Sequence, residues 1–201
     1  VTEGRIEEIG SANATLRIGS ETRQVQAPDV ATAVGLLLDA LVPHFGRREI
    51  SAVAHRVVHG GERFVRPTRI DDDVLNALDE LSSLAPLHNP PAIAAIRAAR
   101  ARFGSVPHFA VFDTAFHTTI PPRAREYPLP ENVRARHRIR RFGFHGISHQ
   151  HVMTRVAQEM RASARDLCII SCHLGNGSSI AAIEYGRSVE TSMGMTPLEG
   201  L

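Results

Sequence analysis

Apolar segments with strand character alternate with amphipathic segments of helical character, and this alternation constrains the fold more than any other feature of the sequence. The runs expected as strands after the first 50 residues are 51–58, 109–112, 167–173 and 179–183. The segments expected as helices between them are 72–84, 89–104 and 147–162. Alternating strands and helices predict a fold of the α/β class.

The N-terminal part carries its own pattern of short strands. The strands expected there, joined by Gly, Ser and Asn turns, are 4–9, 13–18 and 21–26. Together they predict a meander. Asp29 is expected to cap the next helix, because its side chain can accept from the free amides of the first turn. Apolar residues follow at helical spacing from Val30 to Leu41, and Gly46 is expected to end the helix.

A proline-rich stretch interrupts the alternation. Its prolines are Pro121, Pro122, Pro128 and Pro130. Proline removes a backbone donor and restricts the residue before it, so we expect an irregular segment here. Composition makes it the best candidate for a domain boundary.

The basic residues exclude several classes of function. All 23 of them are arginine, which excludes a lysine-containing P-loop and Schiff-base catalysis. The formal net charge of +2 is too small to indicate a nucleic-acid or acidic membrane partner. No run approaches the roughly 18 apolar residues of a membrane span, and the opening residues have no apolar signal segment. We therefore expect a globular protein with neither partner.

The two cysteines bear on the redox compartment. Cys168 and Cys172 lie in one expected strand, on the same face and about 13 Å apart. That separation is too large for a disulfide. We expect reduced thiols and a cytoplasmic protein.

Three short patterns have competing interpretations. Gly175-Asn176-Gly177 is interpreted as a tight turn between strands, whose amides could cradle a phosphate; an ordinary hairpin turn is the alternative. His145 and His149, four residues apart, would share a helix face as a metal pair does, but no third ligand is apparent nearby, so zinc is the weaker interpretation. The arginines of 134–141 suggest a phosphate-binding strip, but without interleaved aromatic residues a solvated strand or loop face is favoured.

Arg56 stands out within an otherwise apolar strand. Period-two geometry puts Arg56 and Val58 on the same face. A guanidinium beside a small apolar wall suits a short carboxylate, with the fork on the anion and the methyl against Val58. A buried ion pair with an Asp or Glu is the equally open alternative.

Six motifs, taken in order, resemble the acetate kinase family. They are HRVVHGGE at 55–62, LAPLHNP at 84–90, VFDTAFH at 111–117, FGFHGISH at 142–149, HLGNGSS at 173–179 and TSMGMTPLEGL at 191–201. The resemblance spans essentially the whole chain and is weaker before residue 50. It departs at Glu190, where Asp is usual, at Met195, where Phe is common, and at Ile147, where Thr is usual.

The resemblance implies an acetate and sugar kinase, heat-shock ATPase and actin-like (ribonuclease H-like) fold in an incomplete two-domain arrangement. Residues 1–114 would form the N-terminal acyl-site domain without its first strand. Residues 115–201 would begin the C-terminal nucleotide-binding domain. The family's second catalytic arginine, its adenosine site and a magnesium-binding glutamate would lie beyond residue 201. An inactive fragment is therefore one expectation.

The implied reaction is phosphoryl transfer between ATP and acetate, giving acetyl phosphate and ADP, with Mg²⁺ or Mn²⁺ and a homodimeric intact enzyme. Propionate or butyrate kinase is the alternative within the class. A non-catalytic fragment that binds anions near Arg56 and Arg141 is the alternative outside it.

The resemblance also implies roles for individual residues. The catalytic pair would be Asp113 and His145. Asp113 would organise magnesium, indirectly, and substrate, and His145 would contact the phosphoryl group. The substrate-binding residues would be Arg56, Val58, Leu87, His88, Phe144 and Pro197, of which Val58, Leu87, Phe144 and Pro197 would line the methyl pocket. The nucleotide-phosphate residues would be His173, Asn176 and Gly177.

Overall fold

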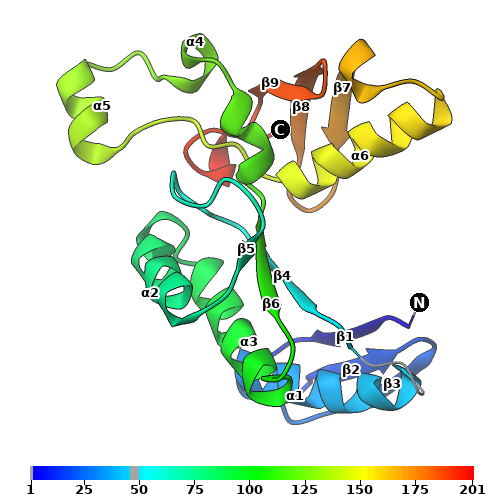
Figure 1. The fold of residues 1–201 in the computed structure, drawn as a ribbon. Coiled ribbons are helices and arrows are strands. Elements are labelled where there is room, and N and C mark those ends of the chain that lie inside the picture. The colour runs from blue at the N-terminus through cyan, green and yellow to red at the C-terminus, as the bar shows by residue number, and fades with distance from the viewer. Residues whose placement is uncertain (1, 46–49) are drawn as a thin grey trace. The chain divides into compact units, whose positions relative to one another are not determined.

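The computed structural model describes residues 2–45 and 50–201 (Figure 1). These residues fall into two compact units, and the chain passes between the units several times. Unit 1 is drawn from residues 1–55, 69–79 and 90–109. Unit 2 consists of residues 56–68, 80–89 and 110–201.

Unit 1 begins with the expected meander. Its strands β1 (Gly4–Glu7), β2 (Thr15–Ile18) and β3 (Glu21–Gln24) pair antiparallel in the order β1-β2-β3. The cap on α1 (Val30–Leu41) is confirmed, because Asp29 Oδ1 accepts from the Thr32 amide at 2.8 Å. A 3-10 turn, Val42–Phe45, follows α1. Gly46, the expected helix end, lies outside the described residues.

A second sheet has the strand order β4-β6-β5. Its strands are β4 (Val53–Val57), β5 (Thr68–Arg69) and β6 (His108–Phe112). The Val53 amide donates to the Pro107 carbonyl at 3.0 Å and the Asp113 amide donates to the Val57 carbonyl at 3.1 Å, so β4 and β6 run in the same direction. The expected strands are confirmed, whereas the sequence did not predict the two-residue β5.

Two helices lie between β5 and β6 in the sequence. The expected helix 72–84 is divided into α2 (Asp72–Glu80) and a 3-10 turn, Leu81–Leu84. The Asp71 side chain accepts from the Val74 amide at 2.8 Å and so caps α2. The next helix, α3 (Asn89–Arg102), begins where proline at the second position supports a first turn.

Unit 2 is built on an antiparallel sheet with the order β7-β8-β9. Its strands are β7 (Cys168–His173), β8 (Ser179–Glu184) and β9 (Arg187–Thr191), of which β9 was not predicted. The helix α6 (Gly146–Glu159) precedes them. Short 3-10 turns lie at Ala115–Thr119, Ala164–Asp166 and Pro197–Glu199. The α/β class is confirmed, and no helix among the described residues combines the length and apolarity that crossing a bilayer requires.

The two faces of the β7-β8-β9 sheet differ in character. On one face Met153 of α6 packs with Ala181 and Ile183 of β8 in a buried cluster. Along β7, Cys168, Ile170 and Cys172 alternate with less exposed residues and are all exposed. Both cysteines are free thiols on this common face, as expected.

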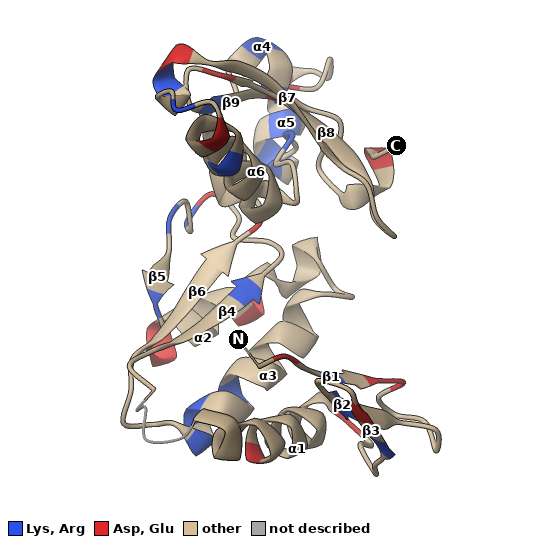
Figure 2. Ribbon diagram, turned by 90° about the vertical axis from the view of Figure 1, so that its right-hand side faces the viewer, with Lys and Arg blue, Asp and Glu red and all other residues tan. Residues whose placement is uncertain are grey.

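The segment 121–141 corrects two expectations. It was expected to be irregular, with a strand or loop carrying its arginines, but it forms α4 (Pro122–Arg125) and α5 (Glu131–His137). The prolines explain the difference: each helix begins directly after or at a proline, whose fixed φ and missing donor suit a helix start. Basic positions mark α5 in Figure 2. The stretch lies within unit 2, and the division into domains 1–114 and 115–201 stays a prediction.

Removal of a buried side chain from the β8 core should destabilise unit 2. Ile183 is 1% exposed, so Ile183→Ala is expected to lower the free energy of unfolding by about 2–5 kcal/mol through lost burial and a new cavity. Ile170 on neighbouring β7 is 69% exposed and supplies the matched control. Urea unfolding should show less than about 0.5 kcal/mol for Ile170→Ala. Equal losses in the two variants would contradict the assignment of the buried face.

Candidate active site

Arg56 and Asp113 form an ion pair at the ends of two adjacent strands. Arg56 Nη2 donates to Asp113 Oδ2 at 2.6 Å, and Arg56 Nε lies 3.2 and 3.1 Å from Oδ1 and Oδ2. The Asp113 side chain is 2% exposed, whereas the Arg56 side chain is 60% exposed. The hydrogen bond that Arg56 donates to Asp113 raises the pKa of Arg56. The ion-pair interpretation of Arg56 is therefore confirmed, with a buried carboxylate and an open guanidinium.

The backbone of Asp113 joins β4 to the start of α6. Its amide donates to the Val57 carbonyl at 3.1 Å, and its carbonyl accepts from the Gly146 amide at 2.9 Å. A Cβ atom at Gly146 would stand 2.2 Å from the Asp113 carbonyl oxygen. Only glycine therefore allows α6 to begin against the end of β6.

His145 occupies the position before α6 with a left-handed backbone. Its φ is 56° and ψ 21°, a conformation uncommon for residues other than glycine, Asn, Asp and His. The conformation places its ring 4.0 Å, centroid to centroid, from the His173 ring at the end of β7, with 23° between the planes. His173 Nδ1 lies 2.9 Å from Ser148 Oγ. The imidazole that precedes α6 thus stacks on the imidazole that ends β7, within unit 2.

Burial and neighbouring charge lower the pKa of His145. Loss of hydration acts most strongly, and His173 and Arg56 act in the same direction, while Asp113 opposes them. The ring is therefore held toward its neutral form. A neutral imidazole has one donor nitrogen and one acceptor nitrogen, so its hydrogen-bond partners decide which nitrogen carries the proton.

The spacing of His145 and His149 does place both rings on one side, but their common partner is a hydroxyl. Ser179 Oγ lies 2.9 Å from His145 Nδ1 and 2.9 Å from His149 Nε2. The zinc interpretation finds no support: the described part of the chain contains no group of three His, Cys, Asp or Glu side chains able to hold a metal.

The side chains near Asp113 also decide whether magnesium can be bound directly. Both carboxylate oxygens of Asp113 already accept from Arg56. The residues present do not fit a protein-only magnesium site, and we assign no direct metal ligand among them.

The Gly175-Asn176-Gly177 segment is a turn between strands, as expected. Strands β7 and β8 pair up to His173 and Ser179, which closes the turn. Ser178 Oγ donates to the Gly175 carbonyl at 3.1 Å. Asn176 and Gly177 are exposed, so their backbone amides can meet a ligand.

The expected methyl pocket is only partly formed from buried residues. Phe144 is 2% exposed and Val58 is half-buried, whereas Leu87 is 82% exposed and Pro197 is exposed. His88 is also exposed. The convergence of these side chains on one methyl group stays a prediction.

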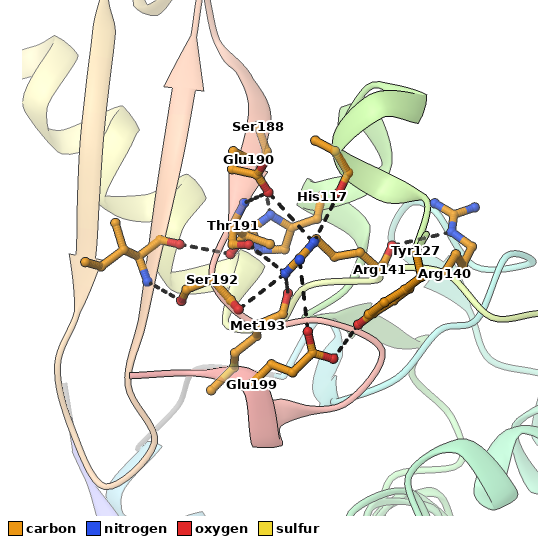
Figure 3. Close-up of polar contacts among 12 residues, drawn as sticks. His117, Tyr127, Arg140, Arg141, Ser188, Glu190, Thr191, Ser192, Met193 and Glu199 are labelled. Carbon is orange, nitrogen blue, oxygen red and sulfur yellow. Dashed lines mark hydrogen bonds and ion pairs between the residues drawn. The ribbon is translucent and has the colours of Figure 1, made fainter. Parts of the chain in front are cut away.

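Arg141 is engaged by the protein itself, which counts against the expectation that it binds an external anion. Its Nη1 donates to the carbonyls of Thr191, Ser192 and Met193 at 3.0, 3.3 and 3.1 Å, and its Nε donates to that of Ala124 at 3.1 Å (Figure 3). Carboxylates of Glu190 and Glu199 lie 3.8 and 4.0 Å away. The guanidinium therefore fastens the segment that carries Pro197.

Tyr127 also holds the segment that carries Pro197. Its hydroxyl is hydrogen-bonded to Glu199 and accepts from the Met195 amide at 2.8 Å (Figure 3). Burial, together with Glu199, raises the pKa of Tyr127. The phenol therefore remains protonated and available as a donor.

Sequence reasoning did not single out the serines that hold the histidines. The hydroxyls are Ser148, Ser171, Ser179 and Ser188, which contact His173, His149, His145 with His149, and His117 respectively. The alternation of buried and exposed positions along a strand was one available signal, because Ser171 and Ser179 occupy buried positions in β7 and β8. Serine at a buried strand position favours a polar partner.

Solved structures of an acetate kinase and of a propionate kinase share this fold. The chain superposes on Porphyromonas gingivalis acetate kinase with a TM-score of 0.90 and 36% identity, covering 100% of this chain and 53% of that one. A propionate kinase from Francisella tularensis gives a TM-score of 0.90 and 37% identity, with 98% and 52% covered. The expected acetate and sugar kinase, heat-shock ATPase and actin-like fold is thereby confirmed.

The chain belongs to the acetokinase family, whose model matches residues 1–201. It is 48% identical over 211 aligned residues to acetate kinase of Desulfitobacterium hafniense, covering 100% of this chain and 53% of the relative. It is 47% identical over 208 to that of Thermotoga maritima, covering 99% and 52%. The chain thus spans about half the length of the curated relatives it matches.

Loss of the Arg141 guanidinium should release the segment 191–199. We expect Arg141→Ala to lower the free energy of unfolding by about 2 kcal/mol, the contribution of hydrogen bonds from a charged donor. Hydrogen exchange of the segment's amides, Met195 included, should accelerate. Exposed Arg136 on α5 provides the control, and Arg136→Ala should change neither quantity. Unaltered exchange in Arg141→Ala would show that the segment is held by other contacts.

Stability should fall in mild acid because several histidines are buried as neutral rings. Burial lowers the pKa of His55, His59, His117 and His149 to about 4. Between pH 6.5 and 4 the unfolded chain binds more protons than the folded chain, so the free energy of unfolding decreases as pH falls through this window.

Urea titrations at several pH values measure that dependence. The decline should be fully developed near pH 4. A free energy of unfolding that stays constant from pH 7 to 4.5 would be incompatible with neutral buried rings.

Proposed function

We propose that this chain binds a short carboxylate at Arg56 and takes part in phosphoryl transfer between ATP and acetate, giving acetyl phosphate and ADP. The observation that carries the proposal is the geometry of Arg56. Asp113 holds Nε and Nη2, while Nη1 has no partner among the described residues and the side chain is 60% exposed. The Nε and Nη2 edge of the guanidinium is thus fixed, and its Nη1 end is open to an anion.

Acetate is already ionised at neutral pH, so the attacking oxygen needs no general base. The protein must instead align the two reactants and neutralise charge on the transferring phosphoryl group. Asp113 is therefore assigned to orienting Arg56 rather than to abstracting a proton. Its buried carboxylate, fixed at the end of β6, suits that role.

The phosphoryl group is assigned to the surface that His145 and the adjoining glycine turn present together. A Cβ atom at Gly177 would lie 3.3 Å from His145 Nε2, so ring and turn adjoin with no side chain between them. Donors of the turn, with His145 and His173, would meet the phosphate oxygens. We propose MgATP as the nucleotide substrate and a homodimer as the state of the complete enzyme, as the family implies.

The choice of carboxylate remains open between acetate and a longer homologue. The 37% identity to a propionate kinase favours propionate as the second candidate. One methylene in an apolar pocket changes binding by about 1–3 kcal/mol. The ratio of kcat/KM for acetate and propionate measures this preference directly.

Truncation of either central side chain should abolish most phosphotransfer. Arg56→Ala removes the open guanidinium donor to the carboxylate, and His145→Ala removes a donor to the phosphoryl group. Each is expected to lower kcat/KM about a hundredfold or more, in line with the loss of one donor to a developing charge. Formation of acetyl phosphate, trapped as its hydroxamate, provides the measurement.

The ion pair of Arg97 with Asp79 supplies a control in unit 1, and Arg97→Ala should keep the unaltered rate. Near-normal rates in Arg56→Ala or His145→Ala would overturn the assignment. Acetate binding at Arg56 without turnover in the unaltered chain would instead favour the non-catalytic anion-binding alternative.

A further inference from the structure

Two imidazoles meet on one buried hydroxyl in unit 2. Ser179 Oγ lies 2.9 Å from His145 Nδ1 and 2.9 Å from His149 Nε2. The other ring nitrogen of His149 extends this row of hydrogen bonds, since its Nδ1 lies 2.9 Å from Ser171 Oγ. Ser171 is 1% exposed and both His149 and Ser179 are 0% exposed, so bulk water does not reach these atoms.

Each hydroxyl has a single proton, which restricts the directions that the hydrogen bonds among Ser171, His149, Ser179 and His145 can take. Ser179 can donate to only one of the two imidazoles, so at least one of them must donate to it. In one order, Ser171 donates to His149 Nδ1 and His149 Nε2–H donates to Ser179. Ser179 then donates to His145 Nδ1, and neutral His145 carries its proton on Nε2.

The opposite order leaves a buried donor without a partner. There His145 Nδ1–H donates to Ser179, Ser179 donates to His149 Nε2, and His149 Nδ1–H donates to Ser171. The Ser171 O–H group then has no acceptor among the described residues. A buried hydroxyl without an acceptor is unfavourable, so the first order is preferred.

His117 makes the same kind of serine–histidine hydrogen bond, and there the position of the ring proton follows from its partners. His117 Nε2 lies 2.9 Å from the Phe144 carbonyl, which can only accept, so Nε2 carries the proton. Ser188 must then donate to His117 Nδ1 at 2.8 Å. A serine thus donates to the Nδ1 atom of a neutral histidine elsewhere in unit 2.

The free nitrogen of His145 faces the glycine turn. A Cβ atom at Gly177 would come within 3.3 Å of Nε2, a tight contact, so glycine at this position keeps the approach to the nitrogen clear. A proton on Nε2 therefore points a donor at whatever anion the turn binds. A proton on Nδ1 would present a lone pair there instead, which repels an anion.

We propose that Ser171, His149 and Ser179 form a relay that holds His145 as a neutral imidazole with its proton on Nε2. His149 and Ser179 are positioning residues, since they act through His145. That the anion is a phosphoryl group rests on the proposed function. The order of protons rests on the hydrogen bonds, with both rings neutral because burial lowers the pKa of each.

Side-chain NMR of the full chain, labelled with ¹⁵N-histidine, tests the order directly. Long-range proton–nitrogen spectra at neutral pH show which ring nitrogen is protonated, and loss of a signal in His145→Gln assigns His145. The relay predicts protonated Nε2 and unprotonated Nδ1 for His145 and for His149. A proton on His145 Nδ1, or a charged ring, in the unaltered chain would overturn it.

Three serine variants separate the relay from general packing. Ser179→Ala should replace the single tautomer of His145 by a mixture, and Ser179→Thr, which keeps the hydroxyl, should restore it. Ser148→Ala removes an equivalent hydroxyl from the stacked His173 and should leave the His145 tautomer unchanged. An unchanged His145 spectrum in Ser179→Ala would refute the relay. If that variant fails to fold, the spectrum of the unaltered chain decides.

Turnover separates failure of the relay from failure of the proposed function. Ser179→Ala should lower kcat about tenfold, the change that about 1.4 kcal/mol of transition-state stabilisation produces, with KM for acetate little changed. An unchanged kcat would refute the positioning role. If the unaltered chain shows the expected tautomer without any phosphotransfer, the relay stands and the proposed function falls.

Discussion

Asp113 holds together the parts of unit 2 on which the candidate site depends. Its amide is bonded to β4, its carbonyl to the first residue of α6, and its carboxylate to Arg56. A charged side chain fixed by its own backbone in this way loses little conformational freedom when it orients a partner. Displacement of this one residue would move the guanidinium and the helix start together.

Much of the architecture could be predicted from local patterns. The meander, the Asp29 cap, the strand that delivers Asp113 and the helix after His145 all follow from hydrophobic period and capping chemistry, which act over a few residues. Arg56 was identifiable because a charged residue in an apolar strand needs a partner. The family could be recognised because six motifs occur in order.

The remaining features depend on contacts between distant segments. Strand β5 has two residues, too few to show a period, and β9 was not predicted. Prolines at α4 and α5 were interpreted as breakers, although the same residue favours a helix start. Ser179 lies 34 and 30 residues from the two histidines it joins, so no spacing rule reveals it. Arg141 likewise finds its carbonyl partners about 50 residues away.

The stacking of His145 on His173 limits the positive charge that His145 brings to the site. Burial, and the His173 ring whose centroid lies 4.0 Å away, both lower the pKa of His145 and hold its ring toward the neutral form. Arg56 is then the permanent charge, and the neutral His145 ring contributes an oriented dipole. Such a site distinguishes anions by the direction of its donors rather than by the sum of its charges, which favours a shaped group over any small anion of equal valence.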